Sequence, residues 1–408
     1  MKTALTRLVP LVLLGSLCGP AWAGDGIELT FGLGLRLAYD SNPQLTPVNT
    51  GHTTTTALDL SFGLTQETAQ STLALGLSGS LAEYGGKRTT TANGFANPNL
   101  TFAYTHTAKT ADFTLNGALA TADLAGPMNV TDFQTGTGTR TTGTLSTGVD
   151  FGKAGPFGVG ATAGLTTVNY QNAPGFAASR TLRLGVTAHT DLSPILHFQI
   201  GLDNSRFTQT GAATRNTPGL DTSLTLDRKT GSFVADLSTN HAPEGQRTTF
   251  DLTRQLELVN GGALSYSLGA TRAATGSSYV IGSLNYQQAL PAGAITLGLN
   301  RAVQANTYTD AETVVSAANL GFTRDITARG ALALALNWAQ QRDTATDLAI
   351  ANTSLSATWT QSLTADWALD LGYTRRLRDQ NLLGPVTSSR GQSDSLFLTL
   401  HRDFSVRY

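Results

Sequence analysis

The chain has 408 residues, of which 13% are charged and 40% hydrophobic, with 43 glycines, one cysteine and a formal net charge of −1. The low net charge argues against a disordered chain and gives no electrostatic footprint for nucleic acid. Beyond the first 23 residues, no apolar run approaches the roughly 20 residues that a membrane-spanning helix needs. A membrane location would therefore require a closed β-barrel, which is the other structure that satisfies every backbone polar group within lipid.

Residues 1–23 have the pattern of a cleaved secretory signal peptide. Two basic residues precede an apolar core at Leu8–Leu17, and Ala21-Trp22-Ala23 provides the small residues of a cleavage site. Removal of the two basic residues leaves 25 basic residues against 28 acidic ones, a net charge of −3. Because Cys18 lies in the removed part, the expected mature chain, residues 24–408, has no disulfide, thiol nucleophile or thiolate metal site.

Strict alternation of apolar and polar residues begins directly after the signal. One face of the first expected strand, residues 27–39, carries Leu29, Phe31, Leu33, Leu35, Leu37 and Tyr39. The same pattern recurs along the chain with short and longer connections in turn, which predicts about 20 strands of about 11 residues, within a range of roughly 18 to 22. Short turns at one end and longer loops at the other are typical of an outer-membrane barrel. The sequence therefore predicts an all-β fold, a transmembrane antiparallel up-and-down β-barrel without a plug domain.

The last stretch, Ser393–Tyr408, is again a strand with one apolar face, and it ends on an aromatic residue. It resembles the closing strand of Gram-negative outer-membrane barrels, which implies that barrel-assembly machinery recognises the strand ending at Tyr408. Tyr39-Asp40-Ser41-Asn42-Pro43 and Arg402-Asp403-Phe404 resemble short motifs of uncharacterised proteobacterial outer-membrane proteins of the β-barrel porin type. The resemblance covers the whole chain in architecture. It implies a bacterial outer-membrane location, with outer-membrane lipid and lipopolysaccharide as neighbours.

The inward parity of the predicted strands carries more aspartate than arginine. The pore-lining candidates are Arg36, Asp59, Asp112, Asp150, Arg183, Asp203, Asp227, Asp236, Asp251 and Asp370. An excess of carboxylates would favour cations weakly. Alternatively, these charges pair across neighbouring strands and set no selectivity.

The longest expected loop, Asp123–Thr141, follows the fifth strand, the position at which trimeric porins fold a loop into the pore. That analogy makes Asp123, Asp132 and Arg140 candidate constriction residues that would face basic wall residues such as Arg183. A loop of this size could equally extend outward at the cell surface.

Several strands end in arginine on the lipid-facing parity at the outer rim. The lipopolysaccharide candidates are Arg206, Arg272, Arg342 and Arg375. Guanidinium groups at this rim would reach the phosphates of lipopolysaccharide, or would simply be solvated.

The six histidines are scattered without metal-ligand spacing, and no phosphate-binding glycine loop is present. We expect neither an enzyme nor a cofactor. The pattern favours a porin-like channel for passive diffusion of small hydrophilic solutes with a weak cation preference. Two other functions fit the same pattern: a non-transporting surface barrel for adhesion, envelope integrity or polymer binding, and a dedicated export conduit for a polysaccharide or lipid.

Overall fold

The computed structural model describes residues 26–49, 51–86, 93–124, 130–134, 136–242, 245–259, 261–306, 308, 310–381 and 388–408, so the predicted signal peptide lies outside the described part. Within these residues the chain forms twenty β-strands and no helix. The strands are β1 Ile27–Asp40, β2 Thr53–Glu67, β3 Ser71–Gly86, β4 Gly94–Thr107, β5 Ala111–Asp123, β6 Thr139–Phe151, β7 Phe157–Gln171, β8 Ser179–Ser193, β9 Leu196–Gln209, β10 Arg215–Arg228, β11 Gly231–Ala242, β12 Gly245–Glu257, β13 Ala263–Arg272, β14 Ser278–Leu290, β15 Gly293–Ala305, β16 Glu312–Thr327, β17 Gly330–Asp343, β18 Ala349–Ser362, β19 Trp367–Asn381 and β20 Ser388–Arg407.

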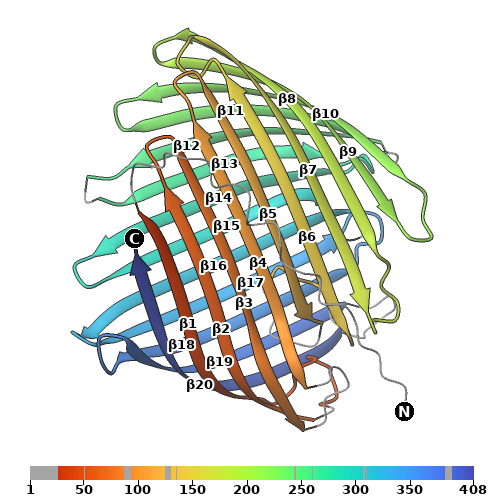
Figure 1. The fold of residues 1–408 in the computed structure, drawn as a ribbon. Helices are drawn as coiled ribbons and strands as arrows, with labels where there is room; N and C mark the ends of the chain where they lie inside the picture. The colour runs from red at the N-terminus through yellow and green to blue at the C-terminus, as the bar shows by residue number, and fades with distance from the viewer. Residues whose placement is uncertain are drawn as a thin grey trace, which may run out of the picture.

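Every strand pairs antiparallel with the next, and β20 returns to pair with β1, so the sheet closes into a barrel (Figure 1). The closing seam runs from Glu28 opposite Arg407 to Asp40 opposite Ser395. At its end the backbone N–H of Tyr408 donates a hydrogen bond to the carbonyl of Ile27 (2.9 Å). Closure leaves no unpaired edge for lipid or another chain to meet. The predicted fold class and strand number are confirmed.

Short turns such as residues 68–70 and 194–195 join the strands at one end of the barrel, which is called the inner end below. The opposite, outer end carries the longer connections. The strands extend further toward this end than the alternation of apolar residues predicts. Residues 388–392, for example, were expected in a loop, yet they continue β20 in register with β19. Backbone pairing continues here because polar side chains do not interrupt the hydrogen-bond ladder.

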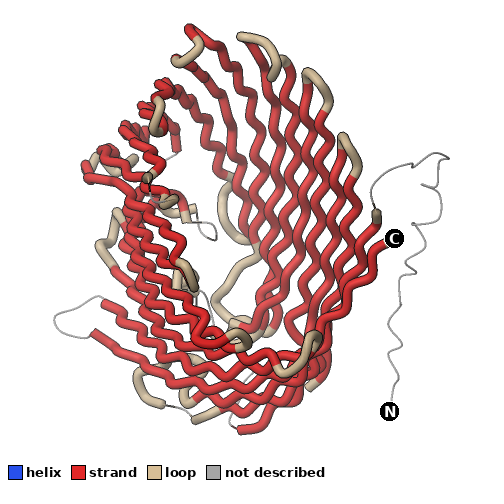
Figure 2. Tube along the Cα trace, turned by 90° about the vertical axis from the view of Figure 1, so that its left-hand side faces the viewer, coloured by secondary structure: helices blue, strands red, loops and turns tan. Residues whose placement is uncertain are grey.

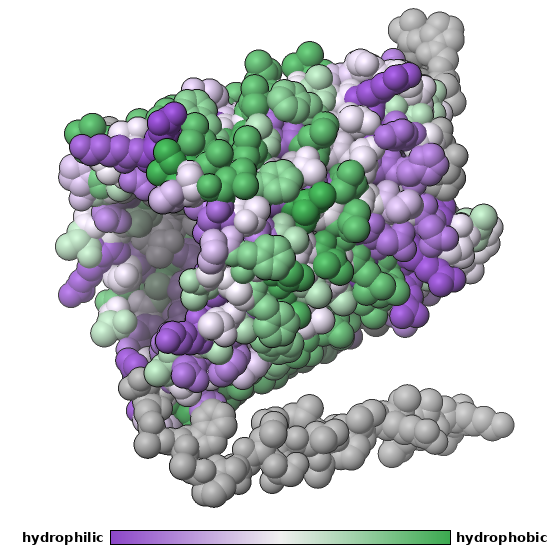
Figure 3. All heavy atoms as spheres, turned by 90° about the horizontal axis from the view of Figure 1, so that it is seen from above, coloured by the Kyte–Doolittle hydropathy of each residue, from purple (hydrophilic) through white to green (hydrophobic). Residues whose placement is uncertain are grey.

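The outer surface of the barrel wall is apolar over its middle, between two polar ends (Figure 3). Leucines of the outward parity are widely exposed: Leu35 exposes 51% of its surface and Leu268 exposes 66%. Exposed apolar patches rarely exceed a few hundred Å² on soluble proteins, so this surface fits contact with lipid. Among the described residues no helix is long and apolar enough to cross a membrane.

The inner face consists mostly of small and polar side chains, and it does not form a continuous packed core. Two small clusters of buried apolar residues occur in the described part. One contains Ala57, Ala82 and Ala96, and the other contains Ala273, Ile281, Val303 and Val314. Stability therefore depends on the closed hydrogen-bond ladder and the apolar outer belt, which leaves the lumen for polar chemistry.

Candidate functional site

The lumen is the candidate site, and the ten predicted pore-lining residues lie on the face opposite the exposed leucines. Several of them have a charged partner on the wall. The Nε of Arg36 lies 3.1 Å from Asp59, and Nε2 of His197 lies 3.2 Å from Asp227. The remaining partnered carboxylates are Asp112, which contacts Lys153, and Asp370, which lies 3.3 Å from Nδ1 of His401. The structure therefore pairs these charges with neighbouring side chains, as the second of the two predictions for the pore-lining charges expects.

The other predicted carboxylates form an acidic stripe at mid-height on neighbouring strands: Asp203 on β9, Asp236 on β11 and Asp251 on β12. Asp236 and Asp251 lie directly opposite each other across β11 and β12. Within the described part of the chain, none of the three forms an ion pair with a basic residue. Like charges placed opposite each other are destabilising, so water, counterions or a shared proton must offset the repulsion within a stripe of this kind.

One member of the acidic stripe was not among the predicted pore-lining residues. Asp221 on β10 completes it, because its carboxylate interacts with those of Asp203 and Asp236. The alternation pattern could have predicted Asp221, because it has the same parity in its strand as the predicted Asp227. The acidic stripe therefore consists of Asp203, Asp221, Asp236 and Asp251. Arg183 and Asp150 also lie on the inner face and form no ion pair with a described residue.

The third outer loop, residues 124–138, folds into the barrel; residues 125–129 and 135 of this loop are outside the described part. Asn352 on β18 donates hydrogen bonds from Nδ2 to the carbonyls of Val130 (2.9 Å) and Asp132 (3.1 Å). Arg378 on β19 donates from Nη2 to the carbonyl of Phe133 (2.6 Å). These strands lie seven positions from β5 and β6, counted back through β1 and β20, so the loop crosses part of the lumen (Figure 2).

Two of the three predicted constriction residues contact each other. Arg140 donates from Nη1 to Oδ1 of Asp132 (3.1 Å), and the two side chains expose only 11% and 12% of their surfaces. Arg183 takes no part in this contact, and Asn352 and Arg378 are the wall residues that the loop reaches instead. Asp123 is buried at the end of β5.

A second loop also folds inward, and none of its residues was among the predicted constriction residues. In the eighth outer loop, residues 306–311, the ring of Tyr308 lies 4.8 Å from the guanidinium carbon of Arg140. The same loop contacts the outer ends of β9 and β10, six strands away, where Gln209 donates to the carbonyl of Tyr308 (3.3 Å) and Arg215 lies 3.0 Å from Asp310. Burial, with the carboxylate of Asp132 nearby, raises the pKa of the Tyr308 phenol above its ordinary value. Tyr308 therefore stays uncharged at neutral pH.

The first outer loop and the first half of β20 form a further polar network at the outer end. Arg376 contacts Asp40, and Ser395 donates to the same carboxylate (2.8 Å). Asn42 is buried and donates from Nδ2 to the carbonyls of Thr46 (2.9 Å) and Gln392 (3.0 Å). This network ties the first outer loop to β19 and β20.

The predicted rim arginines divide into two pairs. Arg342 and Arg375 each have a carboxylate at 3.5 Å, from Asp347 and Asp394 respectively. Arg206 and Arg272 are exposed, and within the described residues neither forms an ion pair. A role in binding lipopolysaccharide stays a prediction for all four.

Among the described residues, no group of three His, Cys, Asp or Glu side chains is placed to hold a metal ion. No protein-family model matches the sequence, and no curated protein matches it. The resemblance to the β-barrel porin type therefore stays a prediction.

Solved structures do show similarity to this chain. The siderophore receptor PirA from Pseudomonas aeruginosa superposes with a TM-score of 0.50 and 10% identity, over 93% of this chain and 81% of that chain. PirA from Acinetobacter baumannii gives a TM-score of 0.48 and 9% identity, over 92% and 80%. OccK2 from Pseudomonas aeruginosa gives 0.45 and 9%, over 93% and 98%. The first of these similarities is one of fold, that of an outer-membrane β-barrel.

Proposed function

We propose that the protein is an outer-membrane channel through which small hydrophilic solutes diffuse passively, with a weak preference for cations. The acidic stripe is the observation that carries this proposal. Four carboxylates without a basic partner in the described chain cannot lie in a dry, packed interior, because burying an uncompensated charge costs several kcal/mol. The acidic stripe supports a lumen that holds water, and water continuous between the two ends would be a diffusion path.

The size of the barrel supports the same proposal. Barrels of 16–18 strands already enclose an aqueous channel, and those of 22 strands hold a plug. Twenty strands with a small-residue wall leave a lumen wide enough to admit water and loops together. The third and eighth outer loops occupy its outer part, so the size limit for solutes is set near Arg140.

The cation preference follows from the position of the charges. The acidic stripe lies on β9–β12, about halfway around the ring from β19 and β1, where Arg376 and Arg36 are held by Asp40 and Asp59. Those arginines are neutralised by their partners, whereas the carboxylates of the stripe are not. A ring or stripe of carboxylates lowers the entry barrier for cations relative to anions.

Planar-bilayer recording on the refolded mature barrel tests the proposal, with folding checked by the shift in gel mobility on boiling. We expect stable ohmic steps in symmetric KCl and a reversal potential of cation-selective sign in a KCl gradient. A folded barrel that conducts no ions would reject the channel and leave a surface barrel or an export conduit. Anion-selective steps would reject the role of the acidic stripe alone.

A further inference from the structure

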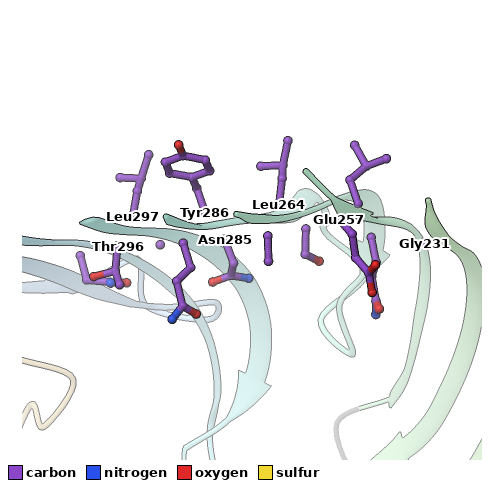
Figure 4. A pocket seen from close by; sticks show the side chains of 14 residues that line it. Gly231, Glu257, Leu264, Asn285, Tyr286, Thr296 and Leu297 are labelled. Carbon is purple, nitrogen blue, oxygen red and sulfur yellow. The ribbon is translucent and has the colours of Figure 1, made fainter. Parts of the chain in front are cut away.

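The barrel wall carries a depression near the inner end, which differs in charge character from the acidic stripe because its lining is mostly uncharged. Its volume is about 490 Å³, within the range usual for small-molecule sites. It is lined by residues of β11 to β16, and Glu257 is its one charged lining residue. Asn285, Thr296 and Glu257 point to the lumen side of the sheet, whereas Leu264, Tyr286 and Leu297 point away from it (Figure 4).

Amide and hydroxyl groups of this depression belong to a longer row, the amide row. Direct cross-strand neighbours follow one another from β12 to β18: Gln255, Ser265, Asn285, Asn319, Asn337 and Ser354, with Gly298 on β15 between the third and the fourth. Directly paired residues have Cβ atoms about 5 Å apart, so the row presents a hydrogen-bonding group at nearly every strand.

The amide row runs along the length of the lumen as well as around it. It starts at Gln255, two residues from the inner end of β12, and its last member, Ser354, pairs with Arg376 just beyond the middle of β19. A row perpendicular to the strands rises along the axis because barrel strands tilt by about 35–45°. The amide row is therefore a track that rises from near the inner end to about the middle of the lumen.

The side chains of the amide row are not engaged in hydrogen bonds with other described residues. None of the six donates or accepts a side-chain hydrogen bond with another described residue, in contrast to Asn352 and Gln209, which hold the inward loops. Gly298 keeps the row open, since a Cβ there would lie 2.1 Å from Oδ1 of Asn319. Amides both donate and accept, and a row of them matches a ligand whose groups do the same.

We infer that the amide row is a binding track for neutral, polyhydroxylated solutes such as short oligosaccharides. Hydroxyl groups donate and accept, so they can replace the water on Asn285, Asn319 and Asn337 without loss of hydrogen bonds. Charged solutes gain nothing comparable from this wall. The inference rests on the proposed channel and names one solute class that the channel would favour.

Block of the ion current by maltotriose tests the track. We expect saturable block, with faster binding from the inner side, because the two inward loops obstruct the outer mouth. The double variant N285A/N319A should raise the half-blocking concentration about tenfold, which corresponds to about 1.4 kcal/mol for the hydrogen bonds lost. The matched control N99A/N116A removes two lumen amides on β4 and β5, outside the row, and should leave block unchanged. A polyethylene glycol of similar size controls for occupied volume.

Conductance that maltotriose lowers no more than the polyethylene glycol does would overturn the track while leaving the channel intact. An equal effect of both double variants would also overturn it. If the folded barrel does not conduct, the proposed channel fails, and calorimetric titration of the same barrel with maltotriose then tests the track. Weaker binding of maltotriose by N285A/N319A than by N99A/N116A supports the track. Absence of binding overturns it.

Discussion

The two ends of the lumen are built from the same alternating strands, yet they treat their polar groups differently. At the outer end Arg140, Arg376 and Arg378 all have acceptors, and two loops are bound to the wall through them. Toward the inner end and mid-height some carboxylates are also paired, such as Asp112 with Lys153, but the amide row and the acidic stripe leave their groups facing the lumen. Polar groups that partner each other hold a shape, whereas groups without partners remain available to solutes. The difference suggests that the outer end selects solutes by size and the rest of the lumen by charge and hydrogen bonding.

The largest effect should come from breaking the outer end at Arg140, where both inward loops meet. Arg140→Ala removes the partner of Asp132, whose side chain is 12% exposed, and the cation beneath the Tyr308 ring. Loss of one member of a buried pair costs about 3–5 kcal/mol, which is enough to release a loop. We expect single-channel conductance to rise at least about twofold, as the narrowest part of a pore sets its conductance.

Arg183→Ala is the matched control for Arg140→Ala, since it also removes a lumen arginine but Arg183 holds no described partner. It should leave conductance close to that of the wild type. If the two variants raise conductance equally, loss of positive charge explains the effect, and the loops do not narrow the pore.

The difference between the two ends also marks how far the sequence could predict the molecule. The barrel could be predicted because alternation and turn length are local, and each strand repeats them. The loop contacts could not: Asn352 and Asp132 are more than 200 positions apart, and nothing in either residue signals that one holds the other. The amide row needs the register of seven strands before its members become neighbours. In the acidic stripe, Asp221 could have been predicted from the alternation of its strand but was not.

A second variant sharpens the role of the acidic stripe. D221N/D236N removes two carboxylates without ion-pair partners in the described chain, and we expect the permeability ratio of K⁺ to Cl⁻ to fall toward one. The control D59N/D112N removes two carboxylates that Arg36 and Lys153 already neutralise. Reversal potentials in a KCl gradient should change more for the first variant. A larger change in the control would assign selectivity to the paired charges and contradict the stripe.

The smallest expected effect concerns the outside of the outer end, where rim arginines face lipid. We propose that Arg206 and Arg272, which have no ion-pair partner among the described residues, bind lipopolysaccharide phosphates. R206Q/R272Q should lose part of the thermal stabilisation that added lipopolysaccharide gives the folded barrel, read as the temperature at which gel mobility shifts. Exposed charge pairs contribute about 0.2–1 kcal/mol each, so the change is small.

The control R342Q/R375Q removes arginines that already have Asp347 and Asp394 as partners. These guanidinium groups would have to exchange a carboxylate for a phosphate, so their loss should reduce the stabilisation less. Without lipopolysaccharide the order reverses, because R342Q/R375Q breaks two ion pairs and R206Q/R272Q breaks none that the described residues contain. A loss of lipopolysaccharide stabilisation that is equal in both variants would mean that the outer rim attracts the lipid by total charge, independent of which arginines are already paired.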